Sequence, residues 1–287
     1  MKIIFIGRDN SFNRKYVNGL SEAHEIICCL FVEPGRNSIQ ERVAKIKSRI
    51  KRYGLLQVIN ELAFHVFDRC LLRRNEKKLH LKNSDYFING IEVKCPAFNV
   101  ENIHSNYWLN YINLQRPDII LNICCSVIFQ PKLYNLPKFG TFTIHEGITP
   151  EYKGLHSSLW ALMNKDFEYI GFTVLKIDEK IDGGDVLLQK RYNLQSGENH
   201  KTWSWISHNS LIEGLQTISN ALKKLEHDNG FTPLNVENRT VNYYTWMTMT
   251  MFIHLYIKNK FRFKHLVQHG RSNSLPRTVV RMDNDSF

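Results

Sequence analysis

The sequence predicts an α/β protein with a mostly parallel sheet between two layers of helices. Short apolar runs typical of buried strands alternate with segments of helical periodicity along most of the chain. The chain opens with a β-α-β pattern, and residues 117–123 form a strong central strand. This alternation favours parallel strands joined by right-handed crossovers, with helices on both faces of the sheet.

The opening β-α-β pattern starts at the first residues. Residues 2–6 are predicted as a buried strand that meets Gly7, followed by a helix over 12–20 and a second strand over 24–32. The polar loop 8–13 lies at the carboxyl end of the first strand, where α/β sheets place ligands. It contains no Gly-x-Gly-x-x-Gly pattern, so a dinucleotide fingerprint is absent.

Residues 39–74 form a long basic stretch with helical spacing of apolar residues and a break expected at Gly54. Its cationic residues include Lys45, Lys47, Arg49, Lys51, Arg52, Arg69, Arg73 and Arg74. Two interpretations stay open: a solvated helix face, or an insertion that binds anions or a membrane surface.

The later elements follow in order. We expect a short strand at 96–100, a helix at 102–114, the central strand at 117–123, a short helix at 131–135, a strand at 139–145, a helix at 157–164, a hairpin-like strand pair at 170–177 and 186–192, and a helix at 200–226 that covers the sheet.

The last part of the chain has a different composition. Residues 243–256 are aromatic and Met-rich, predict a helix, and are followed by four basic residues between 258 and 264. Such a helix packs on its own domain or a second subunit, or it lies on a membrane surface. Residues 270–287 are predicted to be disordered.

Composition and length set limits on the class of protein. The chain has 287 residues, of which 43% are hydrophobic and 23% charged, as expected for one large domain or one domain plus an extension. No apolar run reaches the ~18 residues of a membrane helix, and no small-residue cleavage site follows the first strand. We therefore expect a cytoplasmic protein. A net charge of +11 suits nucleic acid, anionic lipid or a phosphorylated small molecule, and does not choose between them.

The six cysteines form no Cys-x-x-Cys pair, and two adjacent pairs lie in apolar runs. We expect them to be reduced, buried and free of metal, because no His/Cys cluster has the spacing of zinc ligands.

The segment from Thr143 to Gly154, together with Asp182, carries the chemistry. Residues two apart in a strand share a face, so Thr143 and His145 point toward one pocket. Asp182 follows 37 residues after His145 in a loop with two glycines. If that loop folds over the end of the strand, the carboxylate pairs with the imidazole. The pair is then an acid–base centre acting at a carbonyl, or a satisfied histidine near a loop carboxylate.

These motifs resemble the folate-dependent formyltransferase family, which includes glycinamide ribonucleotide, methionyl-tRNA and sugar-nucleotide formyltransferases. The family shows Asn-x-His, a Leu-Pro-x-Tyr-Arg-Gly-like turn and an Asp-x-Gly loop. The matching residues here are His145, Pro150, Tyr152, Lys153, Gly154, Asp182 and Gly183, and the similarity extends over roughly residues 1–226. Thr143 occupies the family's asparagine position; Asn122 is either a replacement donor or a structural strand residue.

The resemblance implies a Rossmann-like catalytic domain at 1–227, with the basic insertion inside it, and a short helical extension at 228–287. It implies formyl transfer from 10-formyltetrahydrofolate to a primary amine, without a metal. His145 would stabilise the oxyanion with the help of the Thr143 hydroxyl, and Asp182 would hold His145 and assist proton transfer. The folate would contact Cys125, Ser126, Val127, Ile128 and Asp178.

On the acceptor side the resemblance points to Tyr152 and Lys153. Glu146 would meet the acceptor amine or face solvent, and His156 would line the acceptor site or pack at a helix start. We expect a small-molecule amine acceptor, that of an amino-sugar nucleotide, rather than nucleic acid, because residues 228–287 lack the strand patterning of the β-barrel that follows the catalytic domain in the tRNA-specific subgroup.

Two alternatives to this function stay open. One is a catalytically silent, folate- or nucleotide-binding regulator or membrane-associated partner. The other is an enzyme resembling methionyl-tRNA formyltransferase. Peripheral membrane contact and a homodimer are also left open by the sequence.

Overall fold

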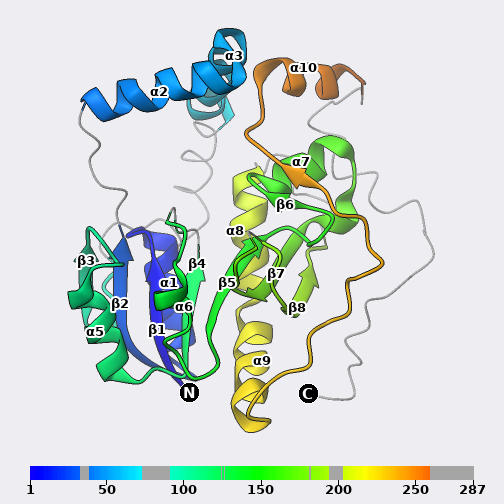
Figure 1. Ribbon diagram of the computed structural model, residues 1–287. Coiled ribbons are helices and arrows are strands. Elements are labelled where there is room, and N and C mark those ends of the chain that lie inside the picture. Colours follow the sequence, from blue (N-terminus) through cyan, green and yellow to red (C-terminus); the bar gives the residue numbers. More distant parts are fainter. Residues whose placement is uncertain are drawn as a thin grey trace.

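A computed structural model describes residues 1–32, 39–72, 91–123, 125, 127–180, 182–193 and 203–258 (Figure 1). Seven strands form one sheet in the order β3-β2-β1-β4-β5-β7-β8. Pairing is parallel from β3 to β5, while the β5–β7 and β7–β8 pairs are antiparallel. The predicted mostly parallel α/β sheet is therefore confirmed. Its strands are β1 (Lys2–Gly7), β2 (Glu25–Val32), β3 (Ala97–Val100), β4 (Ile119–Ile123), β5 (Thr141–Glu146), β7 (Gly171–Lys176) and β8 (Val186–Arg191).

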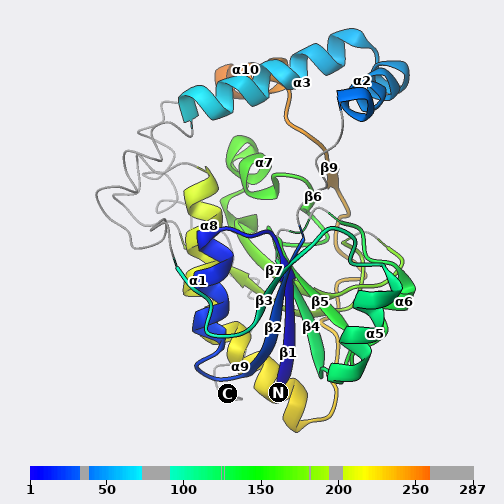
Figure 2. The same ribbon diagram turned by 90° about the vertical axis from the view of Figure 1, so that its left-hand side faces the viewer.

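Helices cover both faces of this sheet. Figure 2 shows α1, α8 and α9 on one side and α5 and α6 on the other. The helices are α1 (Ser11–Leu20), α2 (Ile39–Tyr53), α3 (Leu55–Phe67), α5 (Asn106–Gln115), α6 (Pro131–Tyr134), α7 (Ser157–Asn164), α8 (Trp203–Glu213), α9 (Leu215–His227) and α10 (Met249–Lys258), with a π-helical turn η1 (Asp68–Leu72) and a 3-10 turn η3 (Phe167–Tyr169).

Alternation along β1 creates the two cores. Ile3 and Phe5 belong to the apolar cluster shared with α1 and α9, whereas Ile4 and Ile6 belong to the cluster shared with α5 and α6. All four side chains are fully buried. A strand covered on both faces reads as a continuous apolar run, and this explains the unbroken opening sequence.

Two predicted helices have different bounds in the structure. The segment expected as one helix over 200–226 is divided at Gly214, where an added Cβ would lie 2.2 Å from the Phe172 ring. The predicted helix 243–256 begins at Met249 instead, because Tyr243–Tyr244 forms strand β9 and pairs with β6 (Lys153–Gly154). The predicted break at Gly54 between α2 and α3 is confirmed.

The prediction that the cysteines are buried holds for Cys28 and Cys29. Burial raises the pKa of the Cys28 thiol to about 12. The prediction is wrong for Cys70, which is exposed, and Cys95 and Cys125 are half-buried. Cys124, residues 73–74 and the tail 270–287 lie outside the described residues.

Gly154 provides a test of the packing beside β5. It has φ +94°, and an added Cβ would lie 2.1 Å from the backbone oxygen of Tyr244, which cannot move aside as a side chain would. We expect Gly154→Ala to lower the free energy of unfolding by about 1–2 kcal/mol for the left-handed backbone and by about 1–3 kcal/mol more for the clash. Urea unfolding measures this loss.

Two alanine variants serve as controls. Gly54 has φ +85° with nothing near its missing Cβ, so Gly54→Ala should show the backbone contribution alone. Gly230 has open space and no positive φ, so Gly230→Ala should change stability little. Equal losses in Gly154→Ala and Gly54→Ala would contradict the proposed clash.

Candidate active site

His145 lies on β5 and is only 8% exposed. Its Nε2 atom is 2.9 Å from the Tyr152 carbonyl oxygen and 3.2 Å from Ser157 Oγ. On the other side of the ring, Nδ1 is 3.7 Å from Asp182 Oδ1. The predicted proximity of the imidazole and the loop carboxylate is therefore present in the structure.

The Tyr152 carbonyl determines which nitrogen of His145 exchanges protons. A carbonyl oxygen only accepts, so Nε2 carries a hydrogen in this bond. Nδ1 is then the nitrogen that faces Asp182. A separation of 3.7 Å is too long for a hydrogen bond and suits an ion pair with protonated Nδ1.

The loop that carries Asp182 folds back along β5. The amide of Ile177 donates to the carbonyl of Thr141 at the start of the strand, at 2.7 Å. Asp182 lies near the strand's other end, where its Oδ2 accepts a hydrogen bond of 3.1 Å from the Gly154 amide. One carboxylate therefore contacts both the imidazole and the turn that follows β5.

Gly184, the second glycine of this loop, is required for a steric reason. A Cβ on Gly184 would lie 1.9 Å from the carbonyl oxygen of Lys176, so the loop closes only without a side chain there. Asp182 itself adopts φ +49°, a conformation that Asp tolerates better than most residues.

Thr143 donates its hydroxyl proton to Asn122 Oδ1 on the adjacent strand β4, at 2.9 Å. Asn122 is buried, and its Nδ2 donates to the Ile6 carbonyl at 3.3 Å. The single hydroxyl proton of Thr143 is thus used within the sheet, and Asn122 links β4 to β1. This arrangement is that of a structural strand residue, one of the two roles predicted for Asn122.

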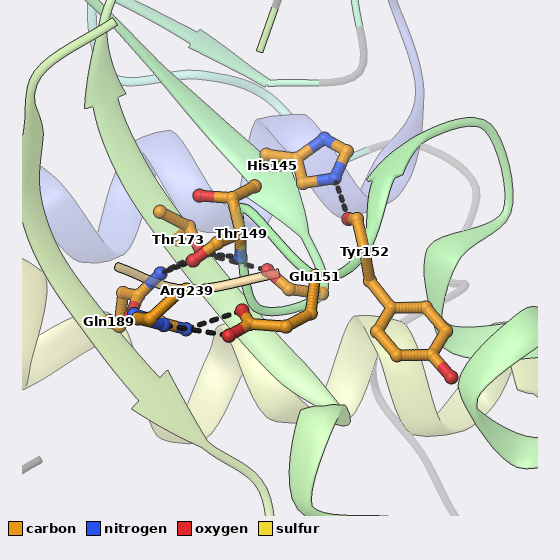
Figure 3. A network of polar contacts seen from close by, with 8 residues as sticks. His145, Thr149, Glu151, Tyr152, Thr173, Gln189 and Arg239 are labelled. Carbon is orange, nitrogen blue, oxygen red and sulfur yellow. Dashed lines mark hydrogen bonds and ion pairs between the residues drawn. The ribbon is translucent and has the colours of Figure 1, made fainter. Parts of the chain in front are cut away.

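The turn between His145 and Gly154 is held from the C-terminal part of the chain (Figure 3). Arg239 binds Glu151 with two hydrogen bonds, Nε to Oε1 at 2.8 Å and Nη2 to Oε2 at 2.5 Å. The side chains are 23% and 9% exposed, so the pair is largely shielded from water. Arg239 also donates from Nη1 to Gln189 Oε1 at 2.8 Å.

Gln189 links Arg239 to the first residues of the turn. Its Nε2 donates to the Thr149 carbonyl and, at 3.2 Å, to Thr173 Oγ1. The Thr173 hydroxyl donates to the Gly147 carbonyl at 2.9 Å and accepts from the Thr149 amide at 3.1 Å. These buried groups fix the backbone that presents the Tyr152 carbonyl to His145.

The residues predicted to contact folate lie on two loops. Ile128 is 74% exposed, and its carbonyl is 3.1 Å from His104 Nε2. Cys125, Val127 and Ile177 pack against the same core cluster, which brings the loop after β4 and the loop after β7 to one face of the sheet. Asp178 is exposed, and its Oδ1 accepts from the Lys180 amide at 2.7 Å. Ser126 lies outside the described residues.

The predicted acceptor-binding residues have different placements. The ring of Tyr152 is buried and stacks on Tyr244 with centroids 4.8 Å apart, so only its carbonyl reaches His145. Burial and the hydrogen bond to Asp166 raise the pKa of the Tyr152 hydroxyl. Glu146 is half-buried and accepts a hydrogen bond from Ser207 on α8.

Lys153 and His156 are half-buried on the turn. Lys153 begins β6, and its amide donates to the Asn242 carbonyl. His156 has φ +56° just before α7, and its ring lies 4.7 Å from that of Trp246. Lys153 and His156 stay predicted acceptor-binding residues.

Sequence reasoning missed Arg239, Gln189 and Ser157. No local pattern marks them, because their partners are 88, 40 and 12 residues away. A lone arginine in a polar segment carries no signal of its own. The described residues also contain no cluster of three or more His, Cys, Asp or Glu side chains that could hold a metal ion.

Fold and site together define a Rossmann-like α/β protein in which a buried histidine faces a half-buried carboxylate beside the end of a central strand. Residues 91–209, which include His145 and Asp182, match the family model described as formyl transferase. The resemblance predicted from the sequence is therefore confirmed for this segment of the chain.

Curated relatives match over about half of the chain or less. The bifunctional polymyxin resistance protein ArnA of Wigglesworthia glossinidia brevipalpis is 25% identical over 150 residues, 52% of this chain and 21% of that protein. The methionyl-tRNA formyltransferase of Kosmotoga olearia is 29% identical over 132 residues, 45% of this chain and 42% of that protein. In both cases the chain spans less than half of the relative's length.

Solved structures are also similar in fold. A sugar N-formyltransferase from Shewanella sp FDAARGOS_354 has a TM-score of 0.46 and 14% identity, with 85% of this chain and 76% of that chain covered. Glycinamide ribonucleotide transformylase 1 from Symbiobacterium toebii has a TM-score of 0.49 and 14% identity, covering 84% and 93%.

The Arg239–Glu151 pair should contribute strongly to stability. We expect Arg239→Met to lower the free energy of unfolding by about 3–5 kcal/mol, because it leaves a shielded carboxylate without its partner. The double variant Arg239→Met/Glu151→Met should recover much of that loss, since no unpaired charge remains. Urea unfolding of the three variants gives the coupling energy; additive losses would contradict a coupled pair.

Proposed function

We propose that this protein transfers a formyl group from 10-formyltetrahydrofolate to the primary amine of an amino-sugar nucleotide. The observation that carries the proposal is the pairing of His145 Nδ1 with Asp182 inside the segment that matches the formyl transferase family. A buried imidazole held through Nε2, with its second nitrogen beside a carboxylate, suits stabilisation of a developing oxyanion.

Each residue of the pair has a defined task in this proposal. Attack by the amine forms a C–N bond at the formyl carbon and places negative charge on the formyl oxygen. Protonated Nδ1 of His145 donates toward that oxygen, and Asp182 stabilises the imidazolium and takes up the proton that the amine loses. That proton then goes to the nitrogen that leaves when the old C–N bond breaks. The Tyr152 carbonyl keeps the ring oriented throughout.

The formyl donor requires an apolar surface for its ring system and acceptors for its ring N–H groups. The exposed Ile128 and the exposed carboxylate of Asp178 supply these two properties, on loops that pack against one core cluster. When bound there, 10-formyltetrahydrofolate supplies the activated one-carbon group. We assign Cys125, Val127, Ile128 and Asp178 to its binding.

Charge and local structure favour a phosphorylated small acceptor. Lys153 and His156 lie on the turn directly after His145, where cations suit the phosphates of a sugar nucleotide. Residues 231–258 do not form a barrel; they bind Glu151, pair with β6 and end in α10.

Two other functions have specific observations in their favour. Several curated relatives are methionyl-tRNA formyltransferases, which favours an aminoacyl-tRNA acceptor. The hydroxyl of Thr143 is used by Asn122, which favours a silent folate-binding protein. A release assay for tetrahydrofolate with amino-sugar nucleotides, methionyl-tRNA and no acceptor separates the three.

Substitution of the pair tests the proposed roles. We expect His145→Asn and Asp182→Asn each to lower kcat/KM by about 100-fold or more, because each removes charge stabilisation at the reacting carbonyl. Tetrahydrofolate release under saturating donor measures the effect, and folate-analogue binding by calorimetry should change little.

The chain provides a matched control for this pair. His227 and Asp228 form an exposed contact of 2.7 Å on the surface at the end of α9. His227→Asn and Asp228→Asn should leave kcat/KM within about twofold, as expected for exposed pairs. Equal activity in His145→Asn and His227→Asn would rule out the proposed site.

Thr143 should matter less than His145. Because its hydroxyl proton is used within the sheet, Thr143→Val should lower kcat by less than about tenfold, far below the 10²–10³ of a lost oxyanion donor. The same release assay checks this, with Thr143→Ser as the variant that keeps the hydroxyl. A loss as large as that of His145→Asn would show that Thr143 acts on the substrate directly.

A further inference from the structure

Helices α2, α3 and α10, together with η1, form a separate layer that we call the helical cap. Figures 1 and 2 show it above α7, at the opposite end of the molecule from the N-terminus. Phe64 of α3 and Phe252 of α10 lie with ring centroids 5.5 Å apart, in a cluster with Leu159 and Met163 of α7. The cap thus packs on α7 through Phe252 of α10 and through the side of α3 that carries Phe64.

The opposite side of α3 is also apolar. Val58 and Phe64 are buried, while the large apolar residues on the other side of the helix are each at least 51% exposed. They recur every three or four residues and so form one stripe along the helix. This exposed stripe consists of Leu55, Leu56, Ile59, Leu62 and Val66.

An open hollow of 540 Å³ lies in this stripe, lined by Ile59, Leu62, Ala63, Val66, Phe67 and Cys70. On α2, Val43 and Ile46 are also each 44% exposed. A solvated helix face, one of the two interpretations open from the sequence, would carry polar residues at these positions. A run of exposed apolar side chains that continues along a whole helix marks an interaction surface.

The described charged side chains that are exposed on α2, α3 and η1 are of one sign. Lys47, Lys51, Arg52 and Arg69 are exposed. The acidic residues Glu61 and Asp68 are buried, and Glu61 is paired with Arg49. Among the described side chains of α2, α3 and η1, those that reach solvent with a charge are therefore cationic.

We propose that the helical cap binds the surface of an anionic lipid bilayer. Aliphatic side chains flanked by Lys and Arg match the interface between acyl chains and negatively charged headgroups. None of the helices in the described ranges has the length and apolar character to cross a bilayer, so the binding is interfacial. A symmetric pair of chains would instead bring two sets of cations face to face, which disfavours a second copy as the occupant.

Vesicle sedimentation of the full chain tests this proposal. We expect cosedimentation with vesicles of phosphatidylcholine and phosphatidylglycerol, little with phosphatidylcholine alone, and strong weakening at about 0.5 M salt. Each cation near such a surface contributes about fivefold to binding, so Lys47→Glu/Lys51→Glu/Arg52→Glu should weaken binding by more than about 100-fold. Leu56→Ser/Ile59→Ser/Val66→Ser should weaken it as well.

Controls use the same changes elsewhere on the surface. Lys132→Glu and Leu114→Ser alter an exposed cation on α6 and an exposed leucine on α5, and both should bind vesicles normally. Unchanged thermal unfolding of every variant shows that the fold is intact.

Equal binding to neutral and anionic vesicles, or normal binding by both cap variants, would overturn the proposal. Absence of vesicle binding would overturn it as well. If analytical ultracentrifugation then showed a dimer that the Leu56→Ser/Ile59→Ser/Val66→Ser variant dissociates, a second copy would be the partner that covers the stripe.

Discussion

The hydrogen bond from His145 Nε2 to the Tyr152 carbonyl connects the catalytic chemistry proposed here to the shape of one turn. The ring keeps its orientation only if the backbone between Gly147 and Gly154 stays in place. Few bonds within the turn itself hold it, among them the one from the Tyr152 amide to the Ile148 carbonyl. Most of its support comes from elsewhere: Thr173 on β7, Gln189 on β8, Arg239, and the backbone of β9.

The sequence predicted the sheet well because each of its strands carries its own signal. An apolar run such as the one over β1 predicts a buried strand from local sequence alone. The alternation of such runs with helices then predicts that the strands pair in parallel. The pairing of His145 with Asp182 was also predicted, since both residues belong to short motifs. Arg239 and Gln189 were not, because the free energy of their contacts arises between distant segments and leaves no periodicity or spacing behind. The close packing of Gly214 against the Phe172 ring was missed for the same reason.

The helical cap shows a different limit of sequence reasoning. Helical spacing over 39–74 correctly predicted helices and their break, yet it could not tell which apolar residues would be buried. In α3 apolar residues occupy two opposite sides, so periodicity alone gives no preferred face. The structure distinguishes the two sides, because Phe64 is buried against Phe252 while Val66 is exposed. The partner of the second side then has to be inferred from charge.

Because the turn is held by Arg239 and Tyr244, the part of the chain before them does not contain all the contacts that keep the turn in place. The segment that matches the formyl transferase family contains both His145 and Asp182, but ends thirty residues before Arg239, which binds the turn between them. An exchange of the chain after residue 209 would therefore also replace Arg239 and Tyr244, which support the turn beside His145.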